Sequence, residues 1–157
     1  MREGNRESWQ KEKKLRLADL FNRRPVIITA TIFSILVFDH LTKLLFTSSC
    51  NSGIAFGILQ STRYSSFVVP FFFIALASFY LLRQKESMLV FLLSLVVGGG
   101  VSNFIDRLIF GCVRDFIDFK IWPSFNLADS AVTVGVLILI LAILTKREAK
   151  KSNDLNH

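Results

Sequence analysis

At 157 residues the chain has room for one domain of ordinary size, yet 52% of its residues are hydrophobic and its mean hydropathy is +0.47. A soluble domain this short cannot bury so much apolar surface, so lipid is the expected solvent. The net charge of +7 lies in blocks between long apolar runs. This composition excludes a disordered chain, a disulfide-stapled mini-protein and a water-soluble nucleic-acid binder.

Four apolar stretches have the length that a helix needs to cross about 30 Å of hydrocarbon, roughly 17 to 25 residues. They cover residues 25–46, 64–82, 88–105 and 127–145. The predicted fold class is therefore an all-α membrane protein: a four-transmembrane-helix bundle with short loop elements at the outer face, where a small β portion could fit. Asp39 and Lys43 interrupt the first stretch and three more spans follow, which favours a permanent helix over a cleaved leader.

The distribution of basic residues predicts the direction of the spans, because Lys and Arg are retained on the cytoplasmic side of short loops. Fourteen of them lie in the head (residues 1–24), the turn after the second span and the tail (residues 146–157), whereas four lie at the opposite ends of the spans. Both termini are therefore expected to be cytoplasmic. The head is either a partly amphipathic segment lying on anionic lipid or a solvated tail.

Polar residues near the spans all fall at one depth, the outer boundary of the membrane. An ionisable group inside a bilayer costs at least about 2.5 to 3.5 kcal/mol on insertion scales, so each is a functional candidate. The outer segments 47–63 and 108–125 join the spans at the same level. Spacings of i, i+3 and i+4 put such residues on one helix face, which predicts a pocket at the membrane surface. The candidates in or beside the spans are Asp39, Lys43, Asn103, Asp106, Arg107, Asn126 and Asp129, and the second outer segment adds Asp115 and Asp118.

The inventory of side chains limits the chemistry of such a pocket. Only His40 and His157 are histidines, so Ser-His hydrolysis and metalloproteolysis of the H-E-x-x-H type lack their base and ligands. Two carboxyl groups brought close cannot both ionise; the charged one can activate water and the neutral one can donate to a carbonyl. The sequence therefore favours aspartyl-type peptide hydrolysis without a metal or organic cofactor. Spacing alone does not select the pair of acids.

Five segments resemble, in order, the signature blocks of the lipoprotein signal peptidase (signal peptidase II) family of bacterial inner-membrane aspartyl endopeptidases. The segments are DHLTK (39–43), NSGIAFG (51–57), NFIDR (103–107), GCVRDF (111–116) and FNLADS (125–130). The resemblance extends over residues 25–145. It implies that Asp115 and Asp129 form the catalytic dyad. It also implies that Asn103, Arg107 and Asn126 support the dyad or substrate, and that Asp39, Lys43, Asn51 and Asp106 shape the pocket.

The same resemblance implies a multi-pass protein of the bacterial inner (cytoplasmic) membrane with its active site at the outer face. Its substrates would be prolipoproteins, cut just before a cysteine that carries diacylglyceryl, and its other partner would be membrane lipid, with no nucleic acid. One residue departs from the family pattern: Arg114 stands where an apolar residue is common. Its charge either lowers the pKa of Asp115 or faces away into water.

Two other classes of function stay open at this point. A small proton-coupled transporter or channel would distribute polar residues through the depth of the bilayer, whereas here they cluster at one edge. A non-enzymatic membrane assembly factor would use the outer segments as a docking surface, and it would tolerate isosteric replacement of its Asp residues by Asn.

Several of these residues also have purely structural interpretations. Asn126 followed by Asp129 is a helix N-terminus signature. Asp39 with Lys43, and Asp106 with Arg107, are expected to form ion pairs that neutralise each other in lipid.

Other features at or near the outer face have no catalytic interpretation. Asp118 is expected to be a solvated loop carboxylate, and residues 98–100, three glycines within a span, to permit close helix packing. Cys50 and Cys112 are expected to be free thiols, with a disulfide as the less favoured alternative.

Overall fold

A computed structural model describes the backbone of residues 3–53 and 64–155. Within these ranges the chain forms four helices and two short strands. In chain order they are α1 (Glu3–Leu45), β1 (Ser49–Asn51), α2 (Ser65–Arg83), α3 (Ser87–Phe110), β2 (Val113–Asp115) and α4 (Leu127–Leu155). Four helical stretches are long and apolar enough to cross a membrane: Arg23–Leu45, Ser65–Arg83, Ser87–Phe110 and Leu127–Glu148. The predicted four-span helical fold with a small β portion is confirmed.

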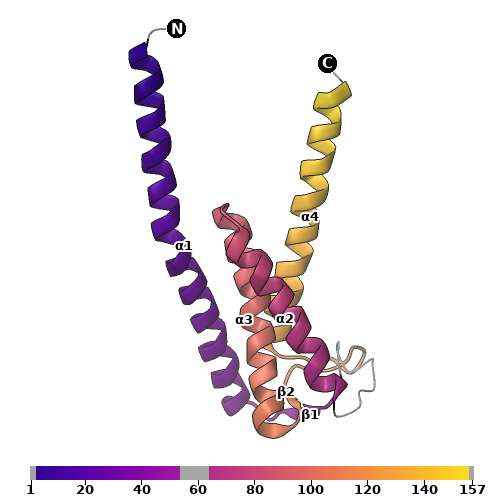
Figure 1. The fold of residues 1–157 in the computed structure, drawn as a ribbon. Helices are drawn as coiled ribbons and strands as arrows, with labels where there is room; N and C mark the ends of the chain where they lie inside the picture. Colours follow the sequence, from indigo (N-terminus) through magenta and orange to yellow (C-terminus); the bar gives the residue numbers. More distant parts are fainter. Residues whose placement is uncertain (1–2, 54–63, 156–157) are drawn as a thin grey trace.

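Helix α3 is the centre of the bundle, and α1, α2 and α4 each pack against it (Figure 1). The two strands lie at one end of the bundle. The beginning of α1 and the end of α4 lie at the other end, as four consecutive spans require. The strand end is thus the end at which the sequence concentrates its polar residues.

Three helices extend well beyond their predicted spans, and one of them is α4, which continues past residue 145 to Leu155. Helix α3 continues beyond residue 105 to Phe110, where Gly111 adopts a left-handed conformation with φ 74° and donates its N–H to the Arg107 carbonyl at 2.9 Å. Glycine adopts this backbone region without the Cβ penalty of other residues. Asp106 and Arg107 therefore lie in the last turn of α3 rather than past its end.

Helix α1 also extends beyond its predicted span, since it begins at Glu3 and runs through Pro25 without ending. The side chains of residues 15–22 lie outside the described part of the chain. The interpretation of the head as a membrane-surface segment therefore stays a prediction.

Close contact between α3 and α4 depends on glycine. A Cβ on Gly99 would overlap the carbonyl oxygen of Ala128 and would lie 2.7 Å from Cγ2 of Val132. A Cβ on Gly98 would lie 3.0 Å from Cδ1 of Ile35 in α1. The predicted packing role of these glycines is confirmed, and it brings the first turn of α4 directly against α3.

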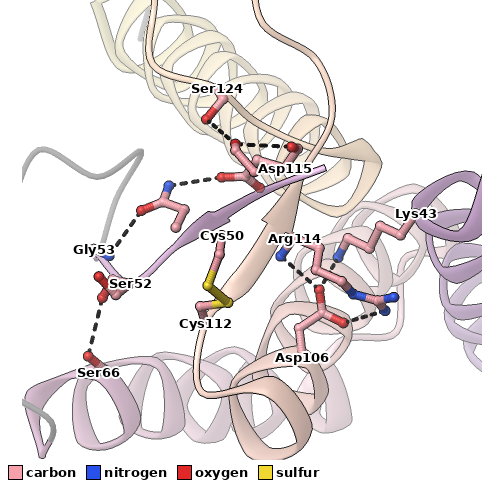
Figure 2. Close-up of a disulfide and its surroundings, with 12 residues drawn as sticks. Lys43, Cys50, Ser52, Gly53, Ser66, Asp106, Cys112, Arg114, Asp115 and Ser124 are labelled. Carbon is pink, nitrogen blue, oxygen red and sulfur yellow. Dashed lines mark hydrogen bonds and ion pairs between the residues drawn. A yellow bond between two sulfur atoms is a disulfide. The ribbon is translucent and has the colours of Figure 1, made fainter. Parts of the chain in front are cut away.

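The strands β1 and β2 form an antiparallel pair in which Ser49 lies opposite Asp115 and Cys50 opposite Arg114. Cys50 and Cys112 form a disulfide with a Cα–Cα distance of 5.6 Å (Figure 2). The expectation of two free thiols was therefore wrong. The pairing of the strands brings together two cysteines that are 62 residues apart in the chain, and spacing in the sequence does not reveal such a contact.

Candidate active site

The predicted site residues at the strand end come from every described helix and strand except α2. Asp115 ends β2, Asp129 lies in the first turn of α4 and Asn126 directly precedes that helix, while Asn103 and Arg107 lie on α3. Asn51 ends β1, and Asp39 and Lys43 lie near the end of α1. Asp106 also lies on α3, so the structure brings all nine predicted site residues to one end of the bundle.

Two side-chain amides connect the carboxyl groups of Asp115 and Asp129. Asn126 Nδ2 donates to Asp115 Oδ1 at 2.8 Å and to Asn103 Oδ1 at 3.0 Å. Asn103 Nδ2 in turn donates to Asp129 Oδ1 at 2.8 Å. Asn126 is fully buried, so its amide has little freedom to rotate away. The two acids are therefore held in a fixed relation by a continuous hydrogen-bonded chain.

The helix N-terminus signature predicted at Asn126 is also present. The backbone N–H of Asp129 donates to Asn126 Oδ1 at 2.9 Å, and the backbone N–H of Asn126 donates to Asp129 Oδ2 at 3.3 Å. This reciprocal pattern is a capping box, which satisfies two donors at the beginning of α4. Asn126 therefore has a structural role and a role in holding the acids at the same time.

The second oxygen of Asp115 is bound from β1. Asn51 Nδ2 donates to Asp115 Oδ2 at 2.8 Å, and Asn51 Oδ1 accepts the backbone N–H of Gly53 at 2.9 Å. Each oxygen of Asp115 thus accepts a hydrogen bond from one asparagine. The remaining residues of this sequence block, 54–57, lie outside the described part of the chain.

The environment of Asp115 changes its acidity. Its side chain is only 2% exposed, and this burial raises the pKa of Asp115 to about 6. The negative charge of Asp129 raises it too, whereas hydrogen bonds from Asn51 and Asn126 and the charge of Lys43 lower it. Asp115 can therefore exchange a proton close to neutral pH.

Arg107 supplies positive charge next to both acids. Its charge interacts with Asp129 and with Asp115, and its Nη2 donates to the carbonyl oxygen of Gly53 at 3.1 Å. The predicted ion pair between Asp106 and Arg107 was wrong, since Asp106 pairs with other cations. Neighbouring residues on a helix point about 100° apart, so they do not face each other.

Lys43 neutralises a second group of carboxylates behind the dyad. Its buried Nζ lies 2.6 Å from Asp39 Oδ2 and 3.0 Å from Asp106 Oδ2, and it donates to Asn103 Oδ1 at 3.3 Å. The predicted pair of Asp39 and Lys43 is confirmed. Lys43 thereby contacts the same oxygen of Asn103 that accepts the hydrogen bond from Asn126.

Asp39 connects α1 to the two helices that carry the site. Its Oδ1 accepts the backbone N–H of Ala128 in α4 at 2.9 Å, and its Oδ2 accepts the hydroxyl of Ser102 at 2.6 Å. Sequence reasoning did not single out Ser102. The available signal was a hydroxyl residue directly before Asn103 in an otherwise apolar span.

Arg114 faces away from Asp115, since successive side chains of a strand point to opposite faces. Its Nη2 and its backbone N–H both donate to Asp106, at 2.9 and 3.0 Å, and its guanidinium lies 4.2 Å from the centroid of the Phe110 ring. The alternative of a group facing away is therefore the right one, although its partner is Asp106 and not water (Figure 2). Asp118 is an exposed loop carboxylate, as expected, and Lys120 Nζ lies 2.6 Å from it.

Two cavities reach Asp129 from different sides. One has a volume of about 470 Å³, has walls from α2, α3 and α4 that are mostly apolar, and reaches Asn103, Arg107 and Asp129. The other has a volume of about 340 Å³ and lies between α4 and the segment that contains Trp122 and Phe125. Asp115 lines neither of these two cavities. Among the described residues, no group of three or more His, Cys, Asp or Glu side chains is arranged to hold a metal ion.

Comparisons with known proteins agree with the resemblance seen in the sequence. A family model described as signal peptidase (SPase) II matches residues 17–145. The lipoprotein signal peptidase of Halothermothrix orenii is 46% identical over 92 residues, which cover 58% of this chain and 63% of that protein. The lipoprotein signal peptidase of Staphylococcus carnosus is 31% identical over 150 residues, which cover 78% of this chain and 94% of that protein. The matched region thus spans a little under two thirds of the first relative and nearly all of the second.

Solved structures give the same picture at the level of the fold. A bacterial membrane enzyme determined by the in meso method at 2.3 Å resolution superposes with a TM-score of 0.71 and 28% identity, covering 78% of this chain and 90% of that one. A second bacterial membrane enzyme, determined at 1.9 Å resolution, superposes with a TM-score of 0.66 and 29% identity, covering 74% and 92%.

Proposed function

Because the chain belongs to the signal peptidase II family, we propose that it is a membrane endopeptidase that removes signal peptides from prolipoproteins. The bond cut is the one just before a cysteine that carries diacylglyceryl. The family match and the four apolar helices carry the coarser part of this statement, a multi-pass membrane protease. The reaction type rests on the site.

The observation that carries an aspartyl mechanism is the amide chain that links Asp115 and Asp129 through Asn126 and Asn103. The dyad acts with one carboxyl ionised and one protonated. The ionised member takes a proton from water as the water attacks the scissile carbonyl, while the protonated member hydrogen-bonds to that carbonyl oxygen. The protonated member then transfers its proton to the leaving amine as the C–N bond breaks, so the dyad again holds one proton, the one taken from water. The two acids titrate as a unit.

The surrounding residues are assigned supporting roles. Asn126, Asn103 and Asn51 orient the carboxyl oxygens, because each donates an amide hydrogen to one of them or connects them. Arg107 limits the repulsion between the two acids. Lys43, between Asp39 and Asp106, holds Asn103 in place from behind.

The position of the site suits a lipid-bearing substrate. The larger cavity runs between α2, α3 and α4 with apolar walls and ends at Asp129, so an apolar segment can remain in the membrane while the peptide bond reaches the acids. The disulfide supports an outer location, because disulfides persist in oxidising compartments outside the cytoplasm. We therefore assign the protein to the bacterial inner membrane with the strand end outward and both termini cytoplasmic.

The other classes of function receive less support. A proton-coupled transporter needs ionisable groups along the depth of the membrane, whereas the buried carboxylates among the described residues gather at the strand end. An assembly factor gives no reason for a buried acid, Asp115, and a half-buried acid, Asp129, to be joined by side-chain amides.

The proposed activity is tested with the purified protein and a matched pair of substrates. One prolipoprotein carries diacylglyceryl on its cysteine and the other is the same chain without the lipid. Mass spectrometry should find a product that begins at the lipidated cysteine, and the unlipidated chain should remain largely intact. Cleavage at another bond, equal cleavage of both chains or no cleavage would contradict the proposal.

A further inference from the structure

The disulfide lies directly next to the residues that hold Asp115. Cys50 immediately precedes Asn51, whose Nδ2 donates to Asp115 Oδ2 at 2.8 Å. Cys112 immediately precedes β2, the strand that ends in Asp115. Figure 2 shows the bridge between Cys50 on β1 and Cys112 just before β2. The bridge thus joins the chain segment of the hydrogen-bond donor to that of its acceptor.

Besides the bridge, strand β1 is held by its short pairing with β2 and by single hydrogen bonds. Cys112 is only 5% exposed, whereas Ser49 and Cys50 are exposed, so the bridge fixes an exposed strand to a buried one. β1 has three residues and pairs with β2 in a two-stranded sheet, and isolated two-stranded ribbons are marginally stable in water. This segment also makes single hydrogen bonds, which include Ser49 Oγ to Asp115 O, Ser49 Oγ with Ser124 Oγ, Ser66 Oγ to Ser52 O and Arg107 Nη2 to Gly53 O.

We propose that the Cys50–Cys112 disulfide is a positioning element of the active site, which holds Asn51 against Asp115, and that its reduction slows peptide cleavage. The inference concerns the acid of the proposed peptidase site and in that respect rests on the proposed function. It assigns no new catalytic residue, since neither sulfur atom touches the substrate or the reacting atoms.

The redox step requires a dithiol as reductant. A thiolate of the dithiol attacks one sulfur atom of the bridge and forms a mixed disulfide, which its second thiolate resolves. Two electrons and two protons pass to the bridge, so that Cys50 and Cys112 become thiols and the dithiol becomes a cyclic disulfide. Exposure of Cys50 gives the reductant access.

Loss of the bridge has a definite consequence for Asp115. The hydrogen bond from Asn51 stabilises the ionised form and lowers the pKa of Asp115 against the effect of burial. When β1 is less firmly held, this bond is made less of the time, and the pKa of Asp115 moves above about 6. Whichever limb of the pH–rate profile reports Asp115 then moves to higher pH.

The first measurement needs no variant of the bridge and no turnover. The full-length protein is titrated in lipid vesicles before and after reduction by dithiothreitol, with complete reduction checked by maleimide labelling of both thiols. The infrared carboxyl band of Asp115 is isolated by subtracting the spectrum of the Asp115→Asn variant. The apparent pKa of Asp115 should rise on reduction, and an unchanged value after complete reduction would overturn the proposal.

The second measurement asks whether the bridge acts through Asn51. Reduction should lower the cleavage rate of the wild type by about tenfold, the effect of roughly one charge-assisted hydrogen bond. The Cys50→Ser/Cys112→Ser variant should match the reduced wild type and should not respond to dithiothreitol. Reduction should lower the cleavage rate of the Asn51→Ala variant by less than about twofold, because the contact with Asp115 is already absent.

The outcomes separate the two proposals. An equal loss on reduction in Asn51→Ala and in the wild type would show that the bridge acts elsewhere, and would contradict the inference. If the oxidised wild type does not cleave a lipidated prolipoprotein, the proposed function fails, while the infrared titration still decides whether the bridge controls Asp115.

Discussion

The side-chain amide of Asn126 donates a 2.8 Å hydrogen bond to Oδ1 of Asp115, so the residue that caps α4 also holds the end of β2. The chain therefore uses one buried amide to begin the helix that carries Asp129 and to orient the other acid. This double use explains why the structural and the functional interpretation of Asn126 are both right.

The two roles of Asn126 can be separated by two substitutions. Serine is as good a helix cap as asparagine but cannot reach both partners with an amide, whereas alanine cannot cap. Asn126→Ser and Asn126→Ala should both lower the cleavage rate, by about tenfold to a hundredfold, since each loses the contact with Asp115. Both variants also lose the buried amide hydrogen bonds, so the cap is measured by their difference: Asn126→Ala should lower the free energy of unfolding by about 1 kcal/mol more than Asn126→Ser does. Equal stability of the two variants would contradict the capping role.

The buried lysine should be essential for stability. Lys43→Met leaves Asp39 and Asp106 without their shared cation, and breaking a buried pair in this way costs about 3 to 5 kcal/mol. The matched control is Lys120→Met, which removes an exposed lysine paired with Asp118 and should leave the free energy of unfolding almost unchanged. The measurement is the free energy of unfolding in mixed micelles. Similar losses in the two variants would refute the assignment of Lys43 as a buried counter-ion.

Close packing between α3 and α4 gives a prediction about glycine. In Gly99→Ala the new methyl group meets the backbone carbonyl of Ala128, which cannot move without shifting the first turn of α4. We expect a loss of about 1 to 3 kcal/mol in the free energy of unfolding, together with a lower cleavage rate, because Asp129 lies in the shifted turn. Gly100→Ala is the control, since its methyl group meets a side chain, Ile74, and should cost less. A larger loss in the free energy of unfolding for Gly100→Ala than for Gly99→Ala would contradict this packing.

Coupling between the two acids is measurable without turnover. The charge of Asp129 raises the pKa of Asp115, so neutralising it in Asp129→Asn should lower the pKa of Asp115 below about 6 and increase its ionised fraction at pH 6. The infrared carboxyl band of Asp115 reports the shift. Asp118→Asn, which alters an exposed loop carboxylate, should leave it unchanged. A pKa of Asp115 that stays the same or rises in Asp129→Asn would mean that the two groups do not interact.

Much of the fold and of the site's location could be predicted from the sequence, because both follow from local physical limits. The lengths of the apolar runs predicted the four spans. Charge is costly in lipid, and Asp39, Lys43 and Asp129 all fall towards the outer ends of their spans, so the sequence predicted that these residues lie at one depth. The choice of Asp115 over Asp118 came from the family resemblance and not from spacing. Here the structure adds a physical difference: Asp115 is buried and amide-bound, whereas Asp118 is exposed.

The contacts that sequence reasoning missed depend on how separate segments pair. The disulfide requires β1 to lie beside β2, and neither three-residue strand has a pattern of its own. Asp106 pairs with Lys43 from α1 and with Arg114, which the turn after α3 folds back onto the helix, whereas adjacency in the sequence suggested Arg107. In each case the contact depends on how separate segments fold together, and the i, i+3 and i+4 spacing of residues on a helix does not describe this.

The most direct test of the account is the turnover number of Asp115→Asn and of Asp129→Asn, each purified separately and assayed on a diacylglyceryl-modified prolipoprotein. Each variant should retain the helical content and oxidised bridge of the wild type, while its turnover falls by at least about a hundredfold, as removal of a general acid or base requires. Asp118→Asn should cleave at the wild-type rate. Wild-type turnover by either Asp115→Asn or Asp129→Asn would contradict the aspartyl dyad.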